Sequence, residues 1–195
     1  ETTVKVFDQM RKLQGYTDEG SPGRDWNVAT GMVIEGKAGF QIMGDWAKGE
    51  FTAAGKTPGV DYYCAATPSN NGYLYNVDSF IFYKSSDPDK QAGQKLLAKL
   101  MMGKNFQKVF NLYKGSIPAR LDVSMDEFDK CAKTSNADIK TAGAKGGLVP
   151  SFAHGMAQGN TMKAALQDII TEHFNSDMSS KDAANALADS VLANM

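Results

Sequence analysis

The sequence lacks an excess of charge of either sign, and this argues against strongly charged partners. It contains 21 Lys and Arg residues against 22 Asp and Glu residues, which gives a formal net charge of −1. Nucleic acids and anionic membranes are bound mainly by basic patches, so we expect neither as the principal partner. No run of about 18 apolar residues occurs, so we expect no segment that spans a bilayer. The chain begins at Glu1 without an initiator Met or an apolar leader, and we expect it to be processed, trimmed or a fragment.

Cysteine and histidine are also scarce, which argues against a metal site. The cysteines are Cys64 and Cys131, and the histidines are His154 and His173. There is no CxxC motif and no Cys/His cluster of the kind that binds zinc, so we expect neither a metal nor another cofactor. The residues alone leave the cysteine pair open between two buried thiols and one disulfide. His173 lies in a predicted helix with Asp177 nearby, and we expect it to be a solvated surface residue.

Motifs of the common enzyme classes are missing as well. The sequence contains no GxSxG, no HExxH, no P-loop and no GxGxxG after a predicted strand. Two carboxylates far apart in sequence can still meet as an acid/base pair, but no pattern points to one. The residues alone therefore give no indication of an enzyme.

Hydrophobic patterns predict few strands and many helices. Three apolar runs have strand propensity, at residues 38–43, 60–66 and 79–83, and residues 67–76 have the composition of a loop. Helices are predicted near residues 3–14, 27–35, 88–101 and 104–113, and two further amphipathic segments cover 162–174 and 184–195. The fold class is α/β with an excess of helix. Three scattered strands make a poor sheet, so we expect that strands are missing and that the chain is the later part of a larger protein.

Capping signals and the helical period predict helix ends and buried faces. The capping signals are Asp45 before a helical turn, Asp87 followed by Pro88, Gly115 after the helix 104–113, Ser124 with Glu127 as a capping box for a helix that carries Phe128 and Cys131, and Ser179 or Ser180 before the last helix. We expect two buried apolar faces, one formed by Ala92, Leu96, Leu97, Leu100 and Met101, the other by Phe106, Val109, Phe110 and Tyr113.

Five aromatic or polar residues lie at the ends of predicted elements, where α/β proteins expose groups to ligands. They are Trp26, Trp46, Asp78, Lys114 and His154. Taken singly, each has an ordinary structural explanation: tryptophan packs in cores, an aspartate before a strand belongs to a turn, and a lysine at a helix C-terminus complements the dipole. Taken together, two indoles, a carboxylate, an ammonium and an imidazole are the kind of set that binds a saccharide.

A sugar ring places specific demands on its site. Its C–H face packs on an aromatic ring, while each of its hydroxyls is both a donor and an acceptor. Ionised side chains give short and strong hydrogen bonds to such hydroxyls, and leaving a buried hydroxyl unpaired costs about 1–3 kcal/mol. Aspartate accepts, lysine donates and histidine does either, so the five residues predict a sugar site.

Longer motifs carry a resemblance to a known family. They are EGKAGFQIMGDWAKGEF at 35–51, NVDSFIFYKSSDPDKQAGQKLLAKLM at 76–101, YKGSIPARLDV at 113–123, and the two closing helices after PSFAHGMAQG. In their order and spacing these blocks resemble the C-terminal half of the extracellular solute-binding proteins of bacterial ABC sugar importers. That group includes maltose-binding protein, and the sequence is most similar to its glucose/mannose-binding branch.

The resemblance implies the two-lobe fold of the type II periplasmic binding proteins, which closes on its ligand around a hinge. Residues 1–77 would belong to the second lobe. Residues 78–115 would cross the hinge and form a portion of the first lobe, and residues 116–195 would return to the second lobe with the C-terminal helices. The N-terminal portion of the same protein would supply the rest of the first lobe and act as a partner of this chain.

The resemblance also implies roles for the five candidate residues. Trp26 and Trp46 would stack on the sugar or flank it. Asp78, Lys114 and His154 would form hydrogen bonds with its hydroxyls.

In function, the resemblance implies a non-enzymatic protein that captures a monosaccharide such as glucose or mannose and delivers it to an ABC permease in the membrane. Such proteins work in the periplasm or at the outer cell face, where disulfides persist, so the resemblance favours a Cys64–Cys131 bridge. One alternative keeps the scaffold and changes the ligand to an oligosaccharide or another polar solute. A second alternative, from another class, is a carbohydrate-active enzyme or a sensor domain.

Overall fold

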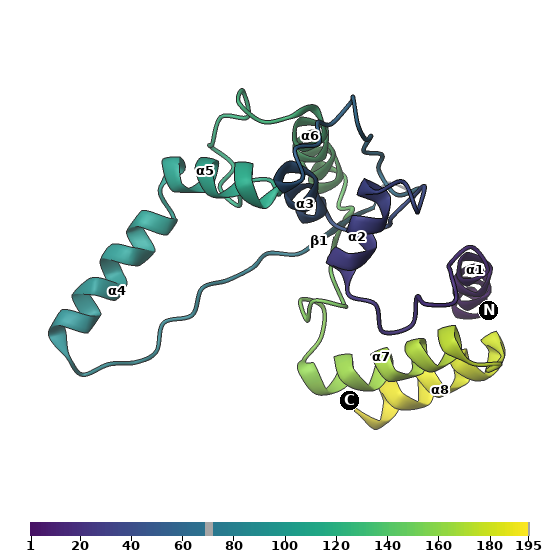
Figure 1. Cartoon of the computed structure of the whole chain (residues 1–195). Helices are drawn as coiled ribbons and strands as arrows, with labels where there is room; N and C mark the ends of the chain where they lie inside the picture. Colours follow the sequence, from purple (N-terminus) through teal and green to yellow (C-terminus); the bar gives the residue numbers. More distant parts are fainter. Residues whose placement is uncertain (69–71, 195) are drawn as a thin grey trace. The chain divides into compact units, whose positions relative to one another are not determined.

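The computed structural model describes residues 1–68 and 72–194 and shows a helix-rich chain (Figure 1). The chain forms two compact units. Unit 1 consists of Glu1–Arg24, Leu74–Asn76 and Pro150–Met195, and unit 2 consists of Asp25–Tyr73 and Val77–Val149. The assignment of residues to two lobes, which follows from the resemblance, stays a prediction.

Unit 1 contains three helices that pack on one another: α1 (Thr2–Gln14), α7 (Asn160–Asn175) and α8 (Ser180–Ala193). Each contributes buried residues to the contact, namely Phe7 of α1, Leu166 of α7 and Ala183 of α8. The Ser179 hydroxyl accepts a hydrogen bond from the Asp182 N–H, so Ser179 caps α8 as the sequence predicts. The predicted amphipathic segments are therefore confirmed as helices; Met195 lies outside the described residues.

His173 of α7 is fully buried, so the expectation of a solvated residue is wrong. Its ring packs on Phe7 with the ring centroids 4.7 Å apart, and its Nε2 lies 3.3 Å from the Ser180 hydroxyl. Its Nδ1 has no hydrogen-bond partner among the described residues. Burial lowers the pKa of His173, the nearby Arg11 guanidinium lowers it further, and Asp8 opposes both effects. The ring faces inward because it lies on the side of α7 that meets α1 and α8.

We expect this buried imidazole to make the protein less stable in weakly acidic solution. The folded-state pKa of His173 lies below the value of about 6.5 typical of an unfolded chain, so the unfolded state takes up the proton first as pH falls. Between pH 7 and 5.5 the free energy of unfolding should fall by at most about 1.4 kcal/mol per pH unit, measured by urea denaturation and circular dichroism. His173→Gln should lose this slope. His154→Gln, which changes the exposed histidine, should keep it, and a slope that persists in His173→Gln would contradict the assignment.

Unit 2 contains the remaining helices: α2 (Trp26–Ile34), the 3-10 turn η1 (Asp45–Ala47), α3 (Lys48–Ala53), α4 (Pro88–Met101), α5 (Lys104–Lys114) and α6 (Lys130–Ala144). Its core is formed by Val123, Phe128 and Ala132, against which Leu112 and Ile117 pack. A disulfide joins Cys64 to Cys131 with the Cα atoms 5.7 Å apart, which confirms the bridge favoured by the resemblance. It fixes the segment after α3 to the first turn of α6.

The three predicted strands at 38–43, 60–66 and 79–83 are wrong. All of these residues are described, and they form no strand; Tyr62 makes one isolated bridge with Pro58. Phe40 is 95% exposed and Ile81 is 77% exposed, so these apolar runs face solvent. A strand needs a neighbour to pair its backbone groups, and in the described part of the chain no segment pairs with these runs.

The observed strands are shorter and lie elsewhere. β1 (Tyr73–Tyr75) pairs with β2 (Leu148–Pro150), and β1 falls inside the segment 67–76 that the sequence predicts as a loop. The Tyr73 N–H donates to the Gly147 carbonyl, and the Ser151 N–H donates to the Tyr75 carbonyl, both at 2.8 Å. Residues 69–71 of the predicted loop lie outside the described part.

Helix ends follow the capping signals in some places and not in others. Asp87 caps α4 ahead of Pro88, and α5 ends at Gly115 in the left-handed conformation, with φ 88°, so both predictions are confirmed. The capping box of Ser124 with Glu127 is wrong, because α6 starts later and is capped by Asp129. Phe128 is buried in the core just before that cap, so the chain has to turn there before the helix can begin.

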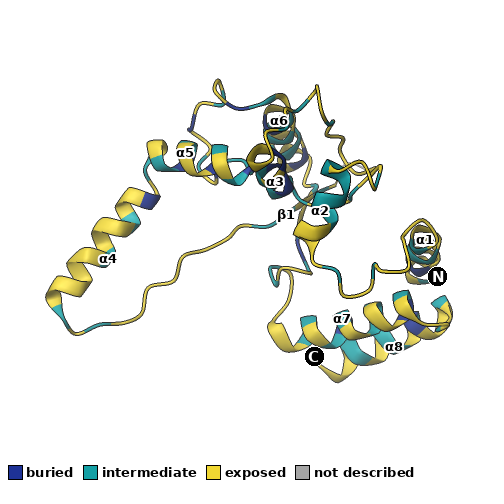
Figure 2. Ribbon diagram, viewed as in Figure 1, coloured by how far each residue is buried: buried dark blue, intermediate teal, exposed yellow. Residues whose placement is uncertain are grey.

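The apolar faces predicted to be buried on α4 and α5 are mostly exposed. Figure 2 shows α4 exposed along most of its length, and Leu96 and Leu100 lie on its exposed surface. In α5 the buried residues are polar: Gln107 donates to the Met101 carbonyl at 2.9 Å, and Asn111 donates to the Gln107 carbonyl at 2.7 Å. The helical period of α5 is predicted correctly. The covered side of α5, however, is the one that faces away from its apolar residues.

Among the helices of residues 1–68 and 72–194, none combines the length and the apolar character needed to cross a membrane.

Candidate functional site

Two of the five candidate residues form an ion pair in unit 2. The Lys114 ammonium contacts the Asp78 carboxylate, although these residues are 36 positions apart in the sequence. The Asp78 side chain is largely exposed and the Lys114 side chain is partly covered, so the pair contributes only about 0–1 kcal/mol to stability. Its main effect is to hold a donor and an acceptor next to each other at the surface, which is the arrangement that a hydroxyl ligand requires.

Lys114 is positioned by a close backbone contact between α5 and α3. It is the last residue of α5, and Gly115 follows in the left-handed conformation. A Cβ built on Gly115 would lie 2.6 Å from the Gly49 nitrogen, and a Cβ built on Gly49 would lie 2.8 Å from the Lys114 carbonyl oxygen. Any residue larger than glycine at either position would push the two helices apart, so the glycine pair sets where Lys114 lies.

Trp46 lies in the turn η1, and its ring packs directly on the backbone before it. A Cβ on Gly44 would fall 2.1 Å from the Trp46 ring, so this packing requires glycine at position 44. As a whole, the residue Trp46 is neither fully buried nor fully exposed. Trp46 therefore packs through one part of its surface and leaves another part accessible, as a platform for a ligand would.

Asp45 directly precedes Trp46 and is partly buried. Gly44 is the N-cap of η1 and Asp45 is its first residue, so the predicted N-cap role of Asp45 is wrong. Burial raises the pKa of Asp45, while Lys48, hydrogen bonds from the Ser116 side chain and the Ile117 backbone, and Lys114 oppose that rise. Burial is the largest of these influences, so the pKa of Asp45 lies above its ordinary value.

Trp26 is the first residue of α2 and is 36% exposed. The Asp25 carboxylate accepts the Trp26 N–H at 2.7 Å, and the Trp26 carbonyl accepts from Thr30 and Gln41 at 2.9 Å. These bonds fix the backbone of Trp26 and leave the indole at the surface. Its role in stacking on a sugar stays a prediction.

His154 belongs to unit 1, in the loop between β2 and α7. Its Nδ1 lies 2.6 Å from the Ser151 hydroxyl, and Ser151 is buried. This contact with a buried hydroxyl orients the imidazole, while the residue as a whole stays exposed. Whether His154 converges with the residues of unit 2 on one ligand stays a prediction.

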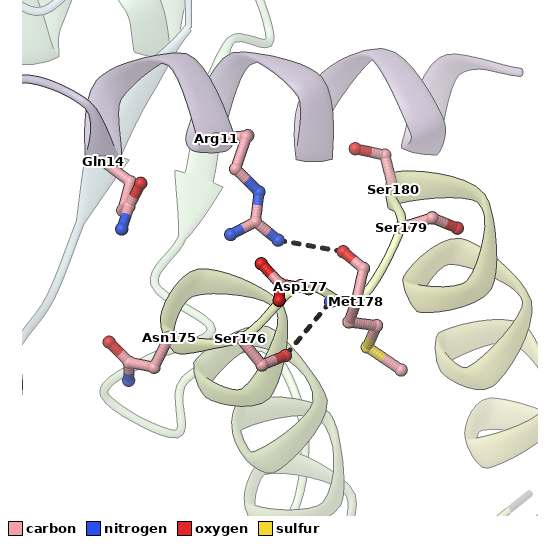
Figure 3. Close-up of a pocket in the computed structure, with 8 residues that line it drawn as sticks. All are labelled: Arg11, Gln14, Asn175, Ser176, Asp177, Met178, Ser179 and Ser180. Atoms are coloured by element: carbon pink, nitrogen blue, oxygen red, sulfur yellow. Dashed lines mark hydrogen bonds between the residues drawn. The ribbon is translucent and has the colours of Figure 1, made fainter.

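A pocket of about 580 Å³ lies in unit 1 (Figure 3), and its lining includes none of the five candidate residues. Arg11 of α1 reaches into it and donates to the Met178 carbonyl at 2.9 Å, and the Met178 N–H donates to the Ser176 hydroxyl at 3.2 Å. Arg11 therefore ties α1 to the connection between α7 and α8, and we assign this pocket a structural role. In residues 1–68 and 72–194 no group of three or more His, Cys, Asp or Glu side chains could hold a metal ion.

Comparison with known proteins identifies the family. Residues 1–169 match the family of bacterial extracellular solute-binding proteins. The chain belongs to this family. Its members bind solutes rather than convert them, which confirms the prediction that the chain is not an enzyme, and they act outside the cytoplasm, as predicted. The helix-rich α/β class is also confirmed.

Several relatives within this solute-binding family have names that mention sugars. The chain is 47% identical, over 99% of its length, to a probable sugar-binding periplasmic protein of Brucella suis, and 44% identical, over 97% of its length, to one of Rhizobium meliloti. It is 26% identical to a xylose/arabinose-binding protein of Haloferax volcanii over 96% of its length. The aligned regions cover 46% of the first two proteins and 40% of the third, so the chain spans just under half the length of these relatives.

Proposed function

We propose that the protein containing this chain is the sugar-binding component of an ABC importer and that its ligand is a monosaccharide such as glucose or mannose. It works in the periplasm or at the outer cell face and passes the sugar to the membrane permease. The observation that carries the proposal is the Asp78–Lys114 ion pair next to the turn of Trp46, in a member of a solute-binding family.

The chemistry of this arrangement suits a small sugar. Lys114 donates to a hydroxyl oxygen and Asp78 accepts a hydroxyl proton, so the two together can bind a pair of neighbouring hydroxyls. The indole of Trp46 offers an apolar face for the C–H side of the ring. Trp26 and His154 complete the proposed set, the first as a second aromatic surface and the second as a further hydrogen-bonding group.

A further part of the same protein is the proposed partner of the exposed apolar faces. Leu96, Leu97 and Leu100 of α4 are exposed, as are Phe80 and Ile81 in the segment before it. An exposed apolar surface of this kind is typical of an interface. The relatives are about twice as long as this chain, and by the resemblance the N-terminal portion of the protein would cover these faces and complete the site.

The proposed function is tested by titrating the complete gene product with sugars. Glucose, mannose, galactose, xylose and maltose are added in turn, and binding is followed by calorimetry and tryptophan emission. Saturable binding of a monosaccharide, recovered unchanged afterwards, supports the proposal. Binding of maltose alone would shift the assignment to an oligosaccharide, and conversion of any sugar would favour the enzyme alternative. No binding of any of them would contradict a sugar ligand.

Trp46→Ala should weaken binding of the preferred sugar at least about tenfold, because buried aromatic contacts dominate binding sites and a tenfold change corresponds to about 1.4 kcal/mol. The matched control is Tyr16→Ala, which removes an exposed aromatic residue in unit 1 and should leave the affinity unchanged. Both variants are checked for helix content by circular dichroism. Unchanged affinity in a folded Trp46→Ala protein would show that this indole only packs on Gly44.

A further inference from the structure

A buried threonine of α2 binds a glutamine from the segment that follows the helix. Thr30 is 0% exposed, and its hydroxyl lies 2.8 Å from Oε1 of Gln41. Gln41 is only partly exposed, whereas its neighbours Phe40 and Ile42 are 95% and 68% exposed. The side chain of Gln41 therefore turns toward α2, while the side chains on either side of it turn to solvent.

The Gln41 amide closes a ring of hydrogen bonds at the backbone of Trp26. Its Nε2 donates to the Trp26 carbonyl at 2.9 Å, and its Oε1 accepts from the Thr30 hydroxyl. The Thr30 hydroxyl also lies 2.9 Å from the Trp26 carbonyl, but a hydroxyl has a single proton and satisfies one acceptor fully at a time. While that proton is shared with Gln41, the Gln41 amide supplies the donor for the Trp26 carbonyl.

Few side chains could make both of these bonds. A carboxamide accepts from a hydroxyl through its oxygen and donates to a carbonyl through its nitrogen, whereas an ionised carboxylate only accepts and an apolar side chain does neither. On the other side of the residue, the Asp25 carboxylate accepts the Trp26 N–H at 2.7 Å. Both backbone polar groups of Trp26 are thus bound by side chains.

Trp26 needs this support because of its place in the helix. α2 has 9 residues, and Trp26 is the first of them. A helix of this length is marginal by itself, and the N–H groups of its first turn have no partner within the helix. The bonds from Gln41 and Asp25 hold this turn, and with it the Cα–Cβ bond from which the indole extends. Trp26 is 36% exposed, so part of the residue stays accessible to a ligand.

We propose that Gln41 is a positioning residue of the sugar site: its amide, held by the buried Thr30 hydroxyl, fixes the first turn of α2 and so presents the indole of Trp26 to the sugar in one orientation. An aromatic surface that is already ordered binds more tightly, because less side-chain freedom is lost on binding. This inference rests on the proposed function, in which Trp26 offers an aromatic surface to the sugar.

The first experiment measures the mobility of the Trp26 indole in the complete protein without sugar. Relaxation of the indole ¹⁵N–¹H group is followed by NMR, and the signal is identified by its loss in Trp26→Phe. We expect an order parameter of about 0.85 in the wild type, as in rigid groups, and below about 0.6 in Gln41→Met and Gln41→Glu. The first variant removes both polar groups of the amide; the second keeps its shape and its acceptor and removes the donor.

The second experiment measures the affinity for glucose and mannose by calorimetry. Gln41→Met should weaken binding about three- to tenfold, because ordering one free side chain on binding has a cost of this order. In a Trp26→Ala protein the same change at Gln41 should have no further effect on affinity, since Gln41 acts through the indole.

The matched control for both experiments is Gln94→Met. Gln94 of α4 donates to the Tyr83 carbonyl at 2.8 Å, so this variant removes the same kind of bond, from a side-chain amide to a backbone carbonyl, in the same unit. It should leave the mobility of the Trp26 indole and the affinity for both sugars unchanged.

The outcomes separate the positioning role from the proposed function. An unchanged order parameter in both Gln41 variants overturns the positioning role, whatever the sugar affinity. So does an equal loss of affinity with and without the Trp26 indole, and so does unchanged affinity despite a mobile indole. A mobile indole in the variants of a protein that binds no sugar supports the hold of Gln41 on Trp26 and contradicts the proposed function instead.

A second pair of variants decides the question if the Gln41 variants do not fold. Thr30→Val removes the buried hydroxyl and keeps the volume of the side chain, and Thr30→Ser keeps the hydroxyl. A more mobile Trp26 indole in Thr30→Val than in Thr30→Ser supports the inference, because only the first variant removes the group that holds the Gln41 amide. Equal mobility in the two variants overturns it.

Discussion

Removal of the Cys64–Cys131 disulfide is expected to lower the free energy of unfolding by about 4 kcal/mol. The bridge closes a loop with a sequence separation of 67 residues, and the loop-entropy relation gives a stabilisation of this size for such a loop. The double variant Cys64→Ala, Cys131→Ala is compared with the oxidised wild type by urea denaturation. A loss of this size is a large part of the stability of an ordinary domain, so the variant should unfold at a much lower urea concentration.

The control for this prediction is chemical reduction. Cys64 lies at the surface, so a reductant can reach the bridge. Reduction should destabilise the wild type to the same extent as the double variant and should have no effect on the double variant itself. A loss below about 1 kcal/mol would mean that the unfolded chain is already restricted in this region, which is a known reason for weak effects of disulfides.

The disulfide also bears on the buried ion pair of Lys48, because Cys131 is the second residue of α6. Asp129 lies two positions earlier, where it caps α6 and pairs with Lys48. Loosening of the first turn of α6 would therefore reach Lys48. The carboxyl of Asp129 is subject to burial, which opposes its ionisation, but Lys48 and the N–H of Ala132 hold its pKa below the ordinary value. This pairing favours the folded state above the unfolded-state pKa of an aspartate, and the benefit is lost as pH falls through the lowered folded-state pKa.

Local sequence signals predicted the helices well because a helix closes its hydrogen bonds within itself. Asp87 before Pro88, Gly115 and Ser179 each determine one end of a helix through contacts a few residues away. The strands failed for the opposite reason. A run such as 38–43 has strand propensity, but only a distant segment can pair with it, and the described part of the chain holds no such partner.

The faces of α5 illustrate a second limit of sequence patterns. Phe110 and Tyr113 mark an apolar side that the period predicts correctly, yet the covered side is the one with Gln107 and Asn111. Buried amides are tolerated there because both of them form hydrogen bonds with backbone groups. Periodicity tells which residues share a face; it does not tell which face meets the rest of the molecule.

For the candidate site, sequence patterns predicted one pair of residues that the structure brings together. Asp78 and Lys114 were chosen as polar groups at element ends, and they form an ion pair. Asp45 was considered only as a helix cap, because the residues that influence the pKa of its carboxyl include Ser116 and Ile117, which lie far along the chain. The contact of Gly49 with Gly115 could not be predicted either, since it depends on how two helices meet.

The contact of Gly115 with Gly49 leaves no room for a side chain at position 115. Gly115→Ala should lower the free energy of unfolding by about 3 kcal/mol and weaken sugar binding. A left-handed conformation costs an L-residue about 1–2 kcal/mol, and forcing a new methyl group into a closed contact costs about 1–3 kcal/mol more. The new Cβ would lie 2.6 Å from the backbone nitrogen of Gly49, which cannot turn away as a side chain could. Lys114 would have to move with the end of α5.

Gly55→Ala, in the same unit, separates the cost of the left-handed conformation from the cost of the close contact between α5 and α3. Gly55 also has a positive φ, of 70°, but a Cβ there would meet nothing within 4 Å. This variant carries only the conformational cost and should lose about 1 kcal/mol, with sugar affinity unchanged. The difference between the two variants therefore measures the helix contact itself, by urea denaturation for stability and by calorimetry for the sugar. Equal losses in both variants would mean that α5 and α3 adjust without strain, and Lys114 would then owe its place to the ion pair with Asp78 rather than to the backbone.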